Sequence, residues 1–192
     1  MDFDDIVNSS GGNISAGDAK VLYETAMDIG AKNILEIGSR EGGSSMIFGH
    51  VAKANGGHVY CIEPMPQQKW FQNIQRHGLS DYVTLIEGMS PWVQLPEGLV
   101  FDEAFFDGDH RSRWLIADYH YHEPSVRPGG LLAFHDWTGA KGTAEKIRRA
   151  VSMILEDDEL EEVARHEADK CGVIVFRKPE GIESFSRRCK LG

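Results

Sequence analysis

Apolar residues along this chain gather in short runs, separated by longer segments in which they recur at helical spacing. Five short runs rich in apolar residues predict strands, and the first, with Ile34, Leu35 and Ile37, predicts a buried parallel strand: residues 33–37, 58–63, 83–88, 101–107 and 131–136. Five segments have apolar residues at helical spacing: one before the first run, three between runs and one after the last. They are residues 15–29, 44–54, 67–77, 113–122 and 142–158. This alternation predicts an α/β fold with a doubly wound, mainly parallel sheet.

The pattern changes after the last of these helices. Two strand-like runs, residues 160–166 and 171–178, are separated only by residues 167–170. A parallel pair needs a long crossover, so this short connection predicts an antiparallel hairpin. The hairpin completes a sheet of seven strands, whereas a plain dinucleotide-binding domain would carry a helix at this point.

Composition narrows the class of protein. The 192 residues are 41% hydrophobic and carry a formal net charge of −10, which fits one globular domain and argues against nucleic acid or an anionic membrane as the main partner. Three scattered cysteines without a C-x-x-C pair predict neither a disulfide framework nor a zinc site. We find no membrane-length apolar run and no signal peptide, so the expected location is the cytoplasm.

Domain boundaries follow from the same pattern. Residues 1–14 are polar and glycine-containing, which predicts a flexible N-terminal arm or short lid. Residues 15–180 hold all the predicted strands and form the expected domain. Residues 181–192 are left as a C-terminal tail, locally basic at residues 187–190.

A glycine-rich turn follows the first predicted strand. Gly38 permits a tight bend with positive φ, and Gly42 and Gly43 would let a ligand approach bare backbone. Ser44 can cap the helix that follows. A strand, a glycine turn and a helix N-terminus together indicate a nucleotide-binding unit, although an ordinary turn with convenient glycines is the alternative.

Two residues of this turn indicate which nucleotide fits. Arg40 stands where a dinucleotide fingerprint needs its second glycine, and its side chain would block a pyrophosphate. Glu36 would repel a pyrophosphate but suits a ligand with a cationic amino group. The pattern E-x-G-x-x-x-G-x-S resembles motif I of class I S-adenosylmethionine (SAM) methyltransferases. This resemblance, together with the predicted hairpin, disfavours an NAD-binding oxidoreductase.

The resemblance implies a set of cofactor contacts. The loop after the first strand would hold the methionine part of SAM, and Glu63, 25 positions after Gly38 at the end of the second strand, would bind the ribose hydroxyls. An exposed glutamate at a strand end is the alternative for Glu63. The implied cofactor residues are Glu36, Gly38, Ser39, Gly42, Gly43, Ser44, Glu63, Gly88, Met89, Ser90 and Asp107.

Five ionisable residues stand at the ends of the fourth and fifth predicted strands: Asp107, Asp109, His110, His135 and Asp136. In an open α/β sheet ligands bind at the carboxyl ends of strands, and we expect these two strands to be neighbours there. Clustered carboxylates repel one another without a cation, so a divalent metal with oxygen and imidazole ligands is predicted. A histidine bonded to backbone and a histidine packed in the core remain the alternatives for His110 and His135.

The motifs F-x-D-G-D-H and R-P-G-G-L-L-A-F-H-D-W resemble a bacterial O-methyltransferase group that includes macrocin O-methyltransferases and cephalosporin hydroxylase relatives. The resemblance implies that Asp107, His135 and Asp136 bind Mg²⁺. This group usually has a carboxylate or amide in place of His135, so Mn²⁺, Fe²⁺ or Zn²⁺ stays open. It also implies that His110 is the general base, with Asp109 orienting it or acting as an extra ligand.

Together these observations predict a SAM-dependent methyltransferase that acts on a hydroxyl oxygen of a small molecule with help from a divalent metal. The alternatives are a metal-independent methyltransferase acting on O, N or C, and a SAM-binding protein without catalysis. No insert interrupts the predicted sheet, so we expect no large built-in cap over the pocket. The pocket is therefore expected to be open or to be closed by a second subunit, which leaves a homodimer as an alternative.

Overall fold

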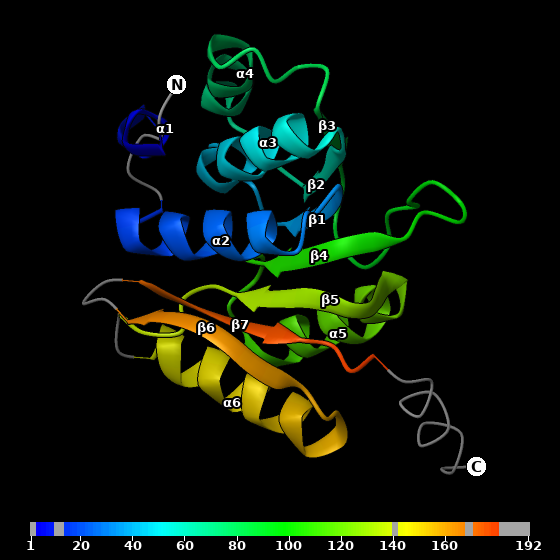
Figure 1. Cartoon of the computed structure of the whole chain (residues 1–192). Helices are drawn as coiled ribbons and strands as arrows, with labels where there is room; N and C mark the ends of the chain where they lie inside the picture. The colour runs from blue at the N-terminus through cyan, green and yellow to red at the C-terminus, as the bar shows by residue number, and fades with distance from the viewer. Residues whose placement is uncertain (1–2, 10–13, 140–141, 168–170, 181–192) are drawn as a thin grey trace.

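A twisted seven-stranded sheet runs through the molecule in the order β3-β2-β1-β4-β5-β7-β6 (Figure 1). The computed structural model describes residues 3–9, 14–139, 142–167 and 171–180. The strands are β1 (Asn33–Ile37), β2 (His58–Glu63), β3 (Val83–Glu87), β4 (Phe101–Phe106), β5 (Val126–Phe134), β6 (Glu161–Glu167) and β7 (Gly172–Arg177). The first five run parallel, and β7 pairs antiparallel with both β5 and β6. The predicted fold class, including the terminal hairpin, is confirmed.

Helices cover both faces of the sheet, as a doubly wound topology requires (Figure 1). They are α1 (Phe3–Ser9), α2 (Ala16–Asp28), α3 (Gly43–Asn55), α4 (Gln68–Arg76), α5 (Ser112–His122) and α6 (Thr143–Asp157), with a 3₁₀ turn η1 at Glu123–Ser125. The first four lie on one face, and α5 and α6 pack on the other. Among the described residues, no helix combines the length and the apolar character that crossing a bilayer requires.

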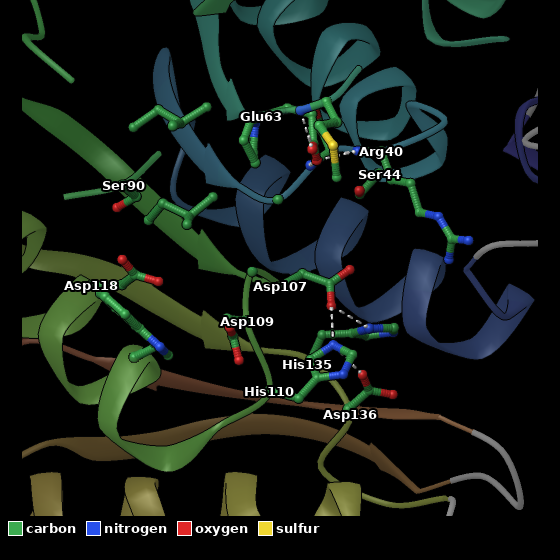
Figure 2. A pocket seen from close by; sticks show the side chains of 18 of the residues that line it. Arg40, Ser44, Glu63, Ser90, Asp107, Asp109, His110, Asp118, His135 and Asp136 are labelled. Atoms are coloured by element: carbon green, nitrogen blue, oxygen red, sulfur yellow. Dashed lines mark hydrogen bonds and ion pairs between the residues drawn. The ribbon is translucent and has the colours of Figure 1, made fainter. Parts of the chain in front are cut away.

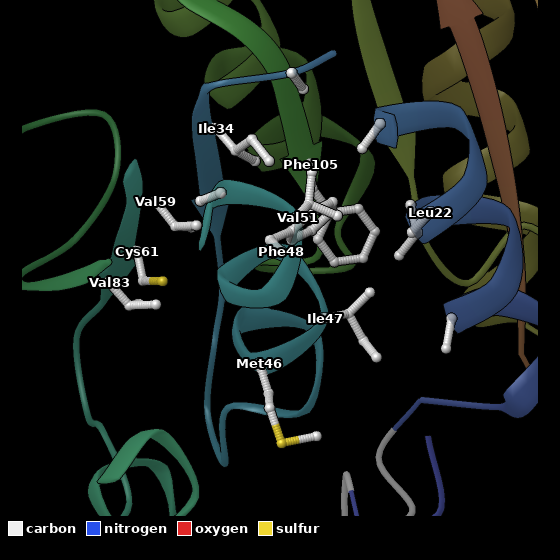
Figure 3. Close-up of a cluster of buried hydrophobic side chains, with 14 of the residues drawn as sticks. Leu22, Ile34, Met46, Ile47, Phe48, Val51, Val59, Cys61, Val83 and Phe105 are labelled. Carbon is white, nitrogen blue, oxygen red and sulfur yellow. The ribbon is translucent and has the colours of Figure 1, made fainter. Parts of the chain in front are cut away.

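Two hydrophobic clusters sandwich the sheet. On the α2–α3 face, Phe48 of α3 packs against Phe105 of β4 with ring centroids 5.5 Å apart, and Leu22 of α2 lies beside them (Figure 3). On the other face, Phe106 stacks on Phe134 at 5.1 Å. Phe105 and Phe106 thus fill opposite cores, which is why residues 104–106 of β4 are all apolar.

Strand β5 begins at Val126, earlier than the run that starts at residue 131 predicts. Gly129 donates its N–H to the carbonyl of Lys178, and the N–H of Lys178 donates to Gly130, so this segment is already paired with the chain after β7. The closely packed Gly130 has no room for a side chain beside the Asp102 carbonyl, 2.7 Å from where a Cβ would stand. Glycine therefore marks a close approach of strands here.

The predicted N-terminal arm contains helix α1. Its Ile6 is only 3% exposed and belongs to the main core, and the ring of Phe3 lies 5.2 Å from that of Tyr23 on α2. The described part of the arm is thus packed against the domain. The predicted tail at residues 181–192 and the hairpin connection at residues 168–170 lie outside the described residues.

Candidate active site

A pocket of about 680 Å³ opens at the carboxyl ends of the parallel strands (Figure 2). One end of it is formed by the glycine loop after β1 and by Glu63 at the end of β2. The other end is formed by ionisable side chains that follow β4 and β5. Eight of the predicted cofactor residues line it: Gly38, Ser39, Gly43, Ser44, Glu63, Met89, Ser90 and Asp107. The five predicted catalytic and metal-binding residues line it as well.

The loop and the acidic end meet at Gly38. Its φ is +86°, and an added Cβ would overlap the carbonyl group of Asp107. The Gly38 N–H donates to Ile62 at 2.9 Å, and the Asp107 N–H donates to Ile37 at 2.8 Å. Only glycine satisfies both the backbone angle and the close approach, so the turn predicted at this position is present for a definite steric reason.

Glu36 is not a pocket residue, contrary to the prediction that it contacts the cofactor. It is fully buried, and its two oxygens accept hydrogen bonds from the hydroxyls of Ser44 and Ser45. Burial raises the pKa of Glu36 to about 7. The helix N-cap is Gly42, at φ +81°, rather than a serine. The serines are instead used to fasten α3 to β1 through Glu36.

Two predicted glycines also lie outside the pocket lining. A Cβ on Gly42 would stand 2.8 Å from the ring of Trp70, and one on Gly88 would overlap Val93. Both glycines therefore allow close packing of neighbouring elements. Sequence spacing alone did not distinguish this role from ligand approach.

The Glu63 side chain is hydrogen-bonded to the backbone of the glycine loop. One carboxylate oxygen accepts the N–H groups of Ser39 at 3.1 Å and Arg40 at 2.8 Å, and the other accepts that of Met65 at 2.9 Å. Arg40 has a positive φ of 38°, which is unfavourable for a residue with a side chain, and these bonds hold it there. Glu63 thus fixes the loop shape as well as lining the pocket.

Ionisable side chains converge at the other end of the pocket (Figure 2). The ligand atoms of Asp107, His110 and Asp136 lie within 4.8 Å of one another. His110 Nε2 is 2.9 Å from Asp136 Oδ2 and 3.7 Å from Asp107 Oδ1. Asp136 has a φ of +54°, a left-handed conformation that is strained for a side-chain-bearing residue and turns it toward the cluster.

His135 takes a different place from the one predicted. It lies behind Asp107, 5% exposed, with Nδ1 3.1 Å from Asp107 Oδ1 and Nε2 3.5 Å from Asp18 Oδ2. Within the described part of the chain, the group formed with Asp107 and Asp136 contains His110 instead. Adjacent residues 135 and 136 therefore have different partners: His135 contacts Asp107 and Asp18, whereas Asp136 contacts His110.

Comparison with known proteins assigns the family. Residues 35–137, more than half of the chain, match a protein family described as a methyltransferase domain. This chain is a member of that methyltransferase family. A search of curated proteins gave no significant match.

Solved structures agree with this assignment at the level of the fold. The O-methyltransferase from Bacillus cereus in complex with SAH is 19% identical, with a TM-score of 0.72 over 92% of this chain and 90% of that one. Cofactor-bound Rv0187 from MTB is 22% identical, with a TM-score of 0.71 over 92% and 88%. The O-methyltransferase TomG from Streptomyces achromogenes, in complex with SAM, is 16% identical, with a TM-score of 0.71 over 92% and 89%.

The protonation of His110 in this methyltransferase differs from that of a free imidazole. Hydrogen bonds to Asp107 and Asp136 raise the pKa of His110 to about 10. The imidazole of the chain alone is therefore protonated at neutral pH. Its proton satisfies two carboxylates that would otherwise repel each other.

Asp109 of the methyltransferase does not orient His110. Its carboxylate lines the pocket but is held by the guanidinium and backbone N–H of Arg111, in an exposed pair. The hydrogen bonds from Arg111 lower the pKa of Asp109. The predicted catalytic role of Asp109 therefore finds no supporting contact with His110.

Sequence reasoning missed Asp118 of α5, which lines the same pocket. It is 4% exposed, its Oδ1 has no hydrogen-bond partner, and burial raises its pKa to about 6. Ser90 lies between it and His122, with Ser90 Oγ 2.7 Å from His122 Nε2. The available signal was a carboxylate in the inward stripe of α5, between Leu115 and Tyr119.

Proposed function

We propose that this methyltransferase uses SAM to methylate a hydroxyl oxygen of a small molecule, with help from a divalent cation. The observation that carries the proposal is one pocket that joins the loop anchored by Glu63 to the group Asp107, His110 and Asp136. A methyl donor and an acceptor group have to meet within a single enclosed space, and this pocket has the volume for both.

The pocket has the polar groups that a nucleoside ligand requires. Ser39 Oγ and Asp118 Oδ1 are buried atoms without hydrogen-bond partners, and both residues line the pocket. Such atoms are unfavourable unless a ligand or water satisfies them. We assign Glu63 to the ribose hydroxyls, since its Oε1 accepts one hydrogen bond, from Met65, and retains a lone pair. SAM and SAH in the related structures support this cofactor.

The donor set at the acidic end fits a hard or intermediate divalent cation. Two carboxylates and one imidazole from separate chain segments already lie within 4.8 Å, and a proton on His110 presently balances them. We propose that Asp107 and Asp136 hold the cation. When bound, it would supply charge that acidifies an acceptor hydroxyl and competes with the His110 proton for both carboxylates.

His110 is the group that we assign to proton removal. Asp136 holds its Nε2 at 2.9 Å, and 45% of the His110 side chain is exposed, so an acceptor can reach it. The methyl group of SAM is already strongly electrophilic, so the protein's main tasks are to align the acceptor oxygen and to receive its proton at Nε2. His110 would be able to receive that proton once a bound cation has taken the place of its own proton between the carboxylates. His135 would hold Asp107 in place from the buried side.

Calorimetry and an activity screen test this proposal. SAM and SAH should bind the purified chain, and NAD should not. Release of SAH should be seen with a panel of hydroxylated small molecules, be abolished by EDTA and be restored by Mg²⁺ or Mn²⁺. Full activity in EDTA would favour the metal-independent alternative, and SAM binding without turnover on any acceptor would favour the non-catalytic one.

A further inference from the structure

A second cluster of metal-ligand side chains lies behind the catalytic end of the pocket. Asp18 of α2, His135 after β5 and Cys171 just before β7 have ligand atoms within 4.8 Å of one another. Asp18 and His135 are almost completely buried, at 0% and 5% exposed, and Cys171 is partly buried. Helix α2 packs against both strands of the hairpin, so segments far apart in sequence meet here (Figure 1).

We propose that Asp18, His135 and Cys171 form a second metal site, selective for Zn²⁺ or a similar thiophilic divalent cation. Mixed oxygen, nitrogen and sulfur donors are typical of zinc. The group of Asp107, His110 and Asp136 has two carboxylates and an imidazole but no sulfur, which suits harder ions. This site goes beyond the methyltransferase function and does not depend on which metal that reaction uses.

The geometry around His135 is that of a metal-binding imidazole. Its Nδ1 faces Asp107 Oδ1 at 3.1 Å, while its buried Nε2 has no hydrogen-bond partner and points toward Asp18 Oδ2. Histidines that bind metals commonly donate one ring N–H to a carboxylate and present the other nitrogen to the ion. Asp107 therefore supplies the orienting contact.

The spacing of the ligand atoms also fits. His135 Nε2 and Asp18 Oδ2 lie 3.5 Å apart, beyond a good hydrogen bond. Two such atoms bound to one tetrahedral zinc at about 2.0–2.1 Å would lie about 3.3 Å apart. An ion can thus be accommodated with little movement of either side chain.

Other contacts fix the orientation of the ligands. The remaining carboxylate oxygen of Asp18 is 2.9 Å from His166 Nδ1, and glycine at position 17 makes room for that ring, because an added Cβ would overlap it. Thr138 donates its hydroxyl to the Cys171 carbonyl at 2.6 Å. These contacts form the outer shell that a built metal site requires.

The site has an open side. His135 and Cys171 both line the pocket, so a water molecule or a substrate atom can complete the coordination. Three protein ligands with one open position are characteristic of zinc sites that contact substrate. The expected ligand is therefore a zinc-class cation in contact with the acceptor end of the pocket.

Cobalt spectroscopy tests the proposal. The full chain would carry Cys189→Ser, since Cys189 lies outside the described residues and its thiol could interfere. Added Co²⁺ should give a near-ultraviolet thiolate-to-cobalt charge-transfer band. Cys171→Ser should abolish the band and Asp18→Asn should weaken Co²⁺ binding at least tenfold. The matched control Cys61→Ala, a buried cysteine on β2, should keep it, and so should Asp136→Asn.

Co²⁺ binding without that band, or a band that survives Cys171→Ser, would overturn the second site. If Cys171→Ser does not fold, X-ray absorption of the zinc-loaded parent decides instead. One sulfur at about 2.3 Å supports the site, and a shell of nitrogen and oxygen alone overturns it. SAM affinity and Mg²⁺-dependent turnover of the same samples report separately on the proposed function.

Discussion

The two ends of the pocket are built in different ways. The loop end is made largely of backbone: Gly38 turns the chain, and Glu63 gathers the N–H groups of Ser39, Arg40 and Met65. The acidic end is made of side chains from separate segments, with Asp107, His110 and Asp136 sharing one proton between carboxylates. A backbone site follows from local sequence, whereas a side-chain cluster depends on how distant segments meet.

The largest effect should come from a side chain added at Gly38, where the two ends of the pocket are in contact. Gly38→Ala places a Cβ against the Asp107 carbonyl at a positive φ, so we expect loss of measurable SAM binding and destabilisation by roughly 3 kcal/mol or more. Gly56→Ala is the matched control, because Gly56 also has a positive φ but nothing within 4 Å. It should cost only about 1 kcal/mol and leave SAM binding intact.

Urea unfolding and SAM calorimetry measure both quantities. If Gly38→Ala changes SAM affinity and the free energy of unfolding no more than Gly56→Ala does, the close contact between the loop and Asp107 contributes to neither.

The acidic end should be separable from the loop end by one substitution. His110→Ala should lower kcat by about 10²–10⁴-fold, because it removes the proposed proton acceptor. SAM affinity should stay nearly unchanged, since the loop end does not contact this side chain. Steady-state kinetics and calorimetry on the same preparation provide the test, and parental kcat at neutral pH would rule out His110 as the base. Partial recovery at high pH would support the role.

Glu36 should affect stability and not binding. Its pKa is about 7 in the folded chain and about 4.5 in the unfolded one, so the folded state holds the proton more tightly. Stability should therefore fall as pH rises from about 4.5 to 7, by up to roughly 3 kcal/mol. Glu36→Gln should flatten this dependence, since serine hydroxyls can rotate to donate or accept.

Urea unfolding at several pH values measures the slope. Glu87 on β3 is exposed, so Glu87→Gln serves as the control and should leave the pH dependence of stability unchanged. A tenfold loss of SAM affinity in Glu36→Gln would instead support the prediction that Glu36 contacts the cofactor.

The smallest effect is expected at Glu63. Glu63→Ala removes ribose hydrogen bonds and the anchor of the loop, and should weaken SAM binding by roughly 1–3 kcal/mol without changing the metal requirement. Calorimetry with and without Mg²⁺ checks both statements. Unchanged SAM affinity would show that the loop holds its shape, and the cofactor its place, without this carboxylate.

The sequence predicted the fold because the burial pattern is local. Short runs rich in apolar residues marked the parallel strands, and the four-residue gap at residues 167–170 was too short for anything except a hairpin. Gly38 was recognisable for the same reason, since a turn directly after a buried strand needs a residue with freedom at φ.

The details of the site could not be predicted in this way. Which of His110 and His135 faces Asp136 depends on the backbone conformation of Asp136, whose φ of +54° cannot be predicted from the side-chain pattern. Asp18 lies on a helix far from the motifs in sequence, and Asp118 lies on the helix just after one of them; both reach the site through the packing of their helices. The buried position of Glu36 could not be predicted either, because it depends on the hydroxyls of Ser44 and Ser45, which donate to its carboxylate instead of capping the helix.

The three N–H groups held by Glu63 have a further consequence for the thermodynamics of cofactor binding. A loop already locked in its bound shape loses little conformational entropy when a ligand arrives, so most of the contact energy is available as affinity. A loop without such an anchor would have to be ordered at the moment of binding. The single carboxylate at the end of β2 thus acts before any cofactor is present, by removing a free-energy penalty in advance.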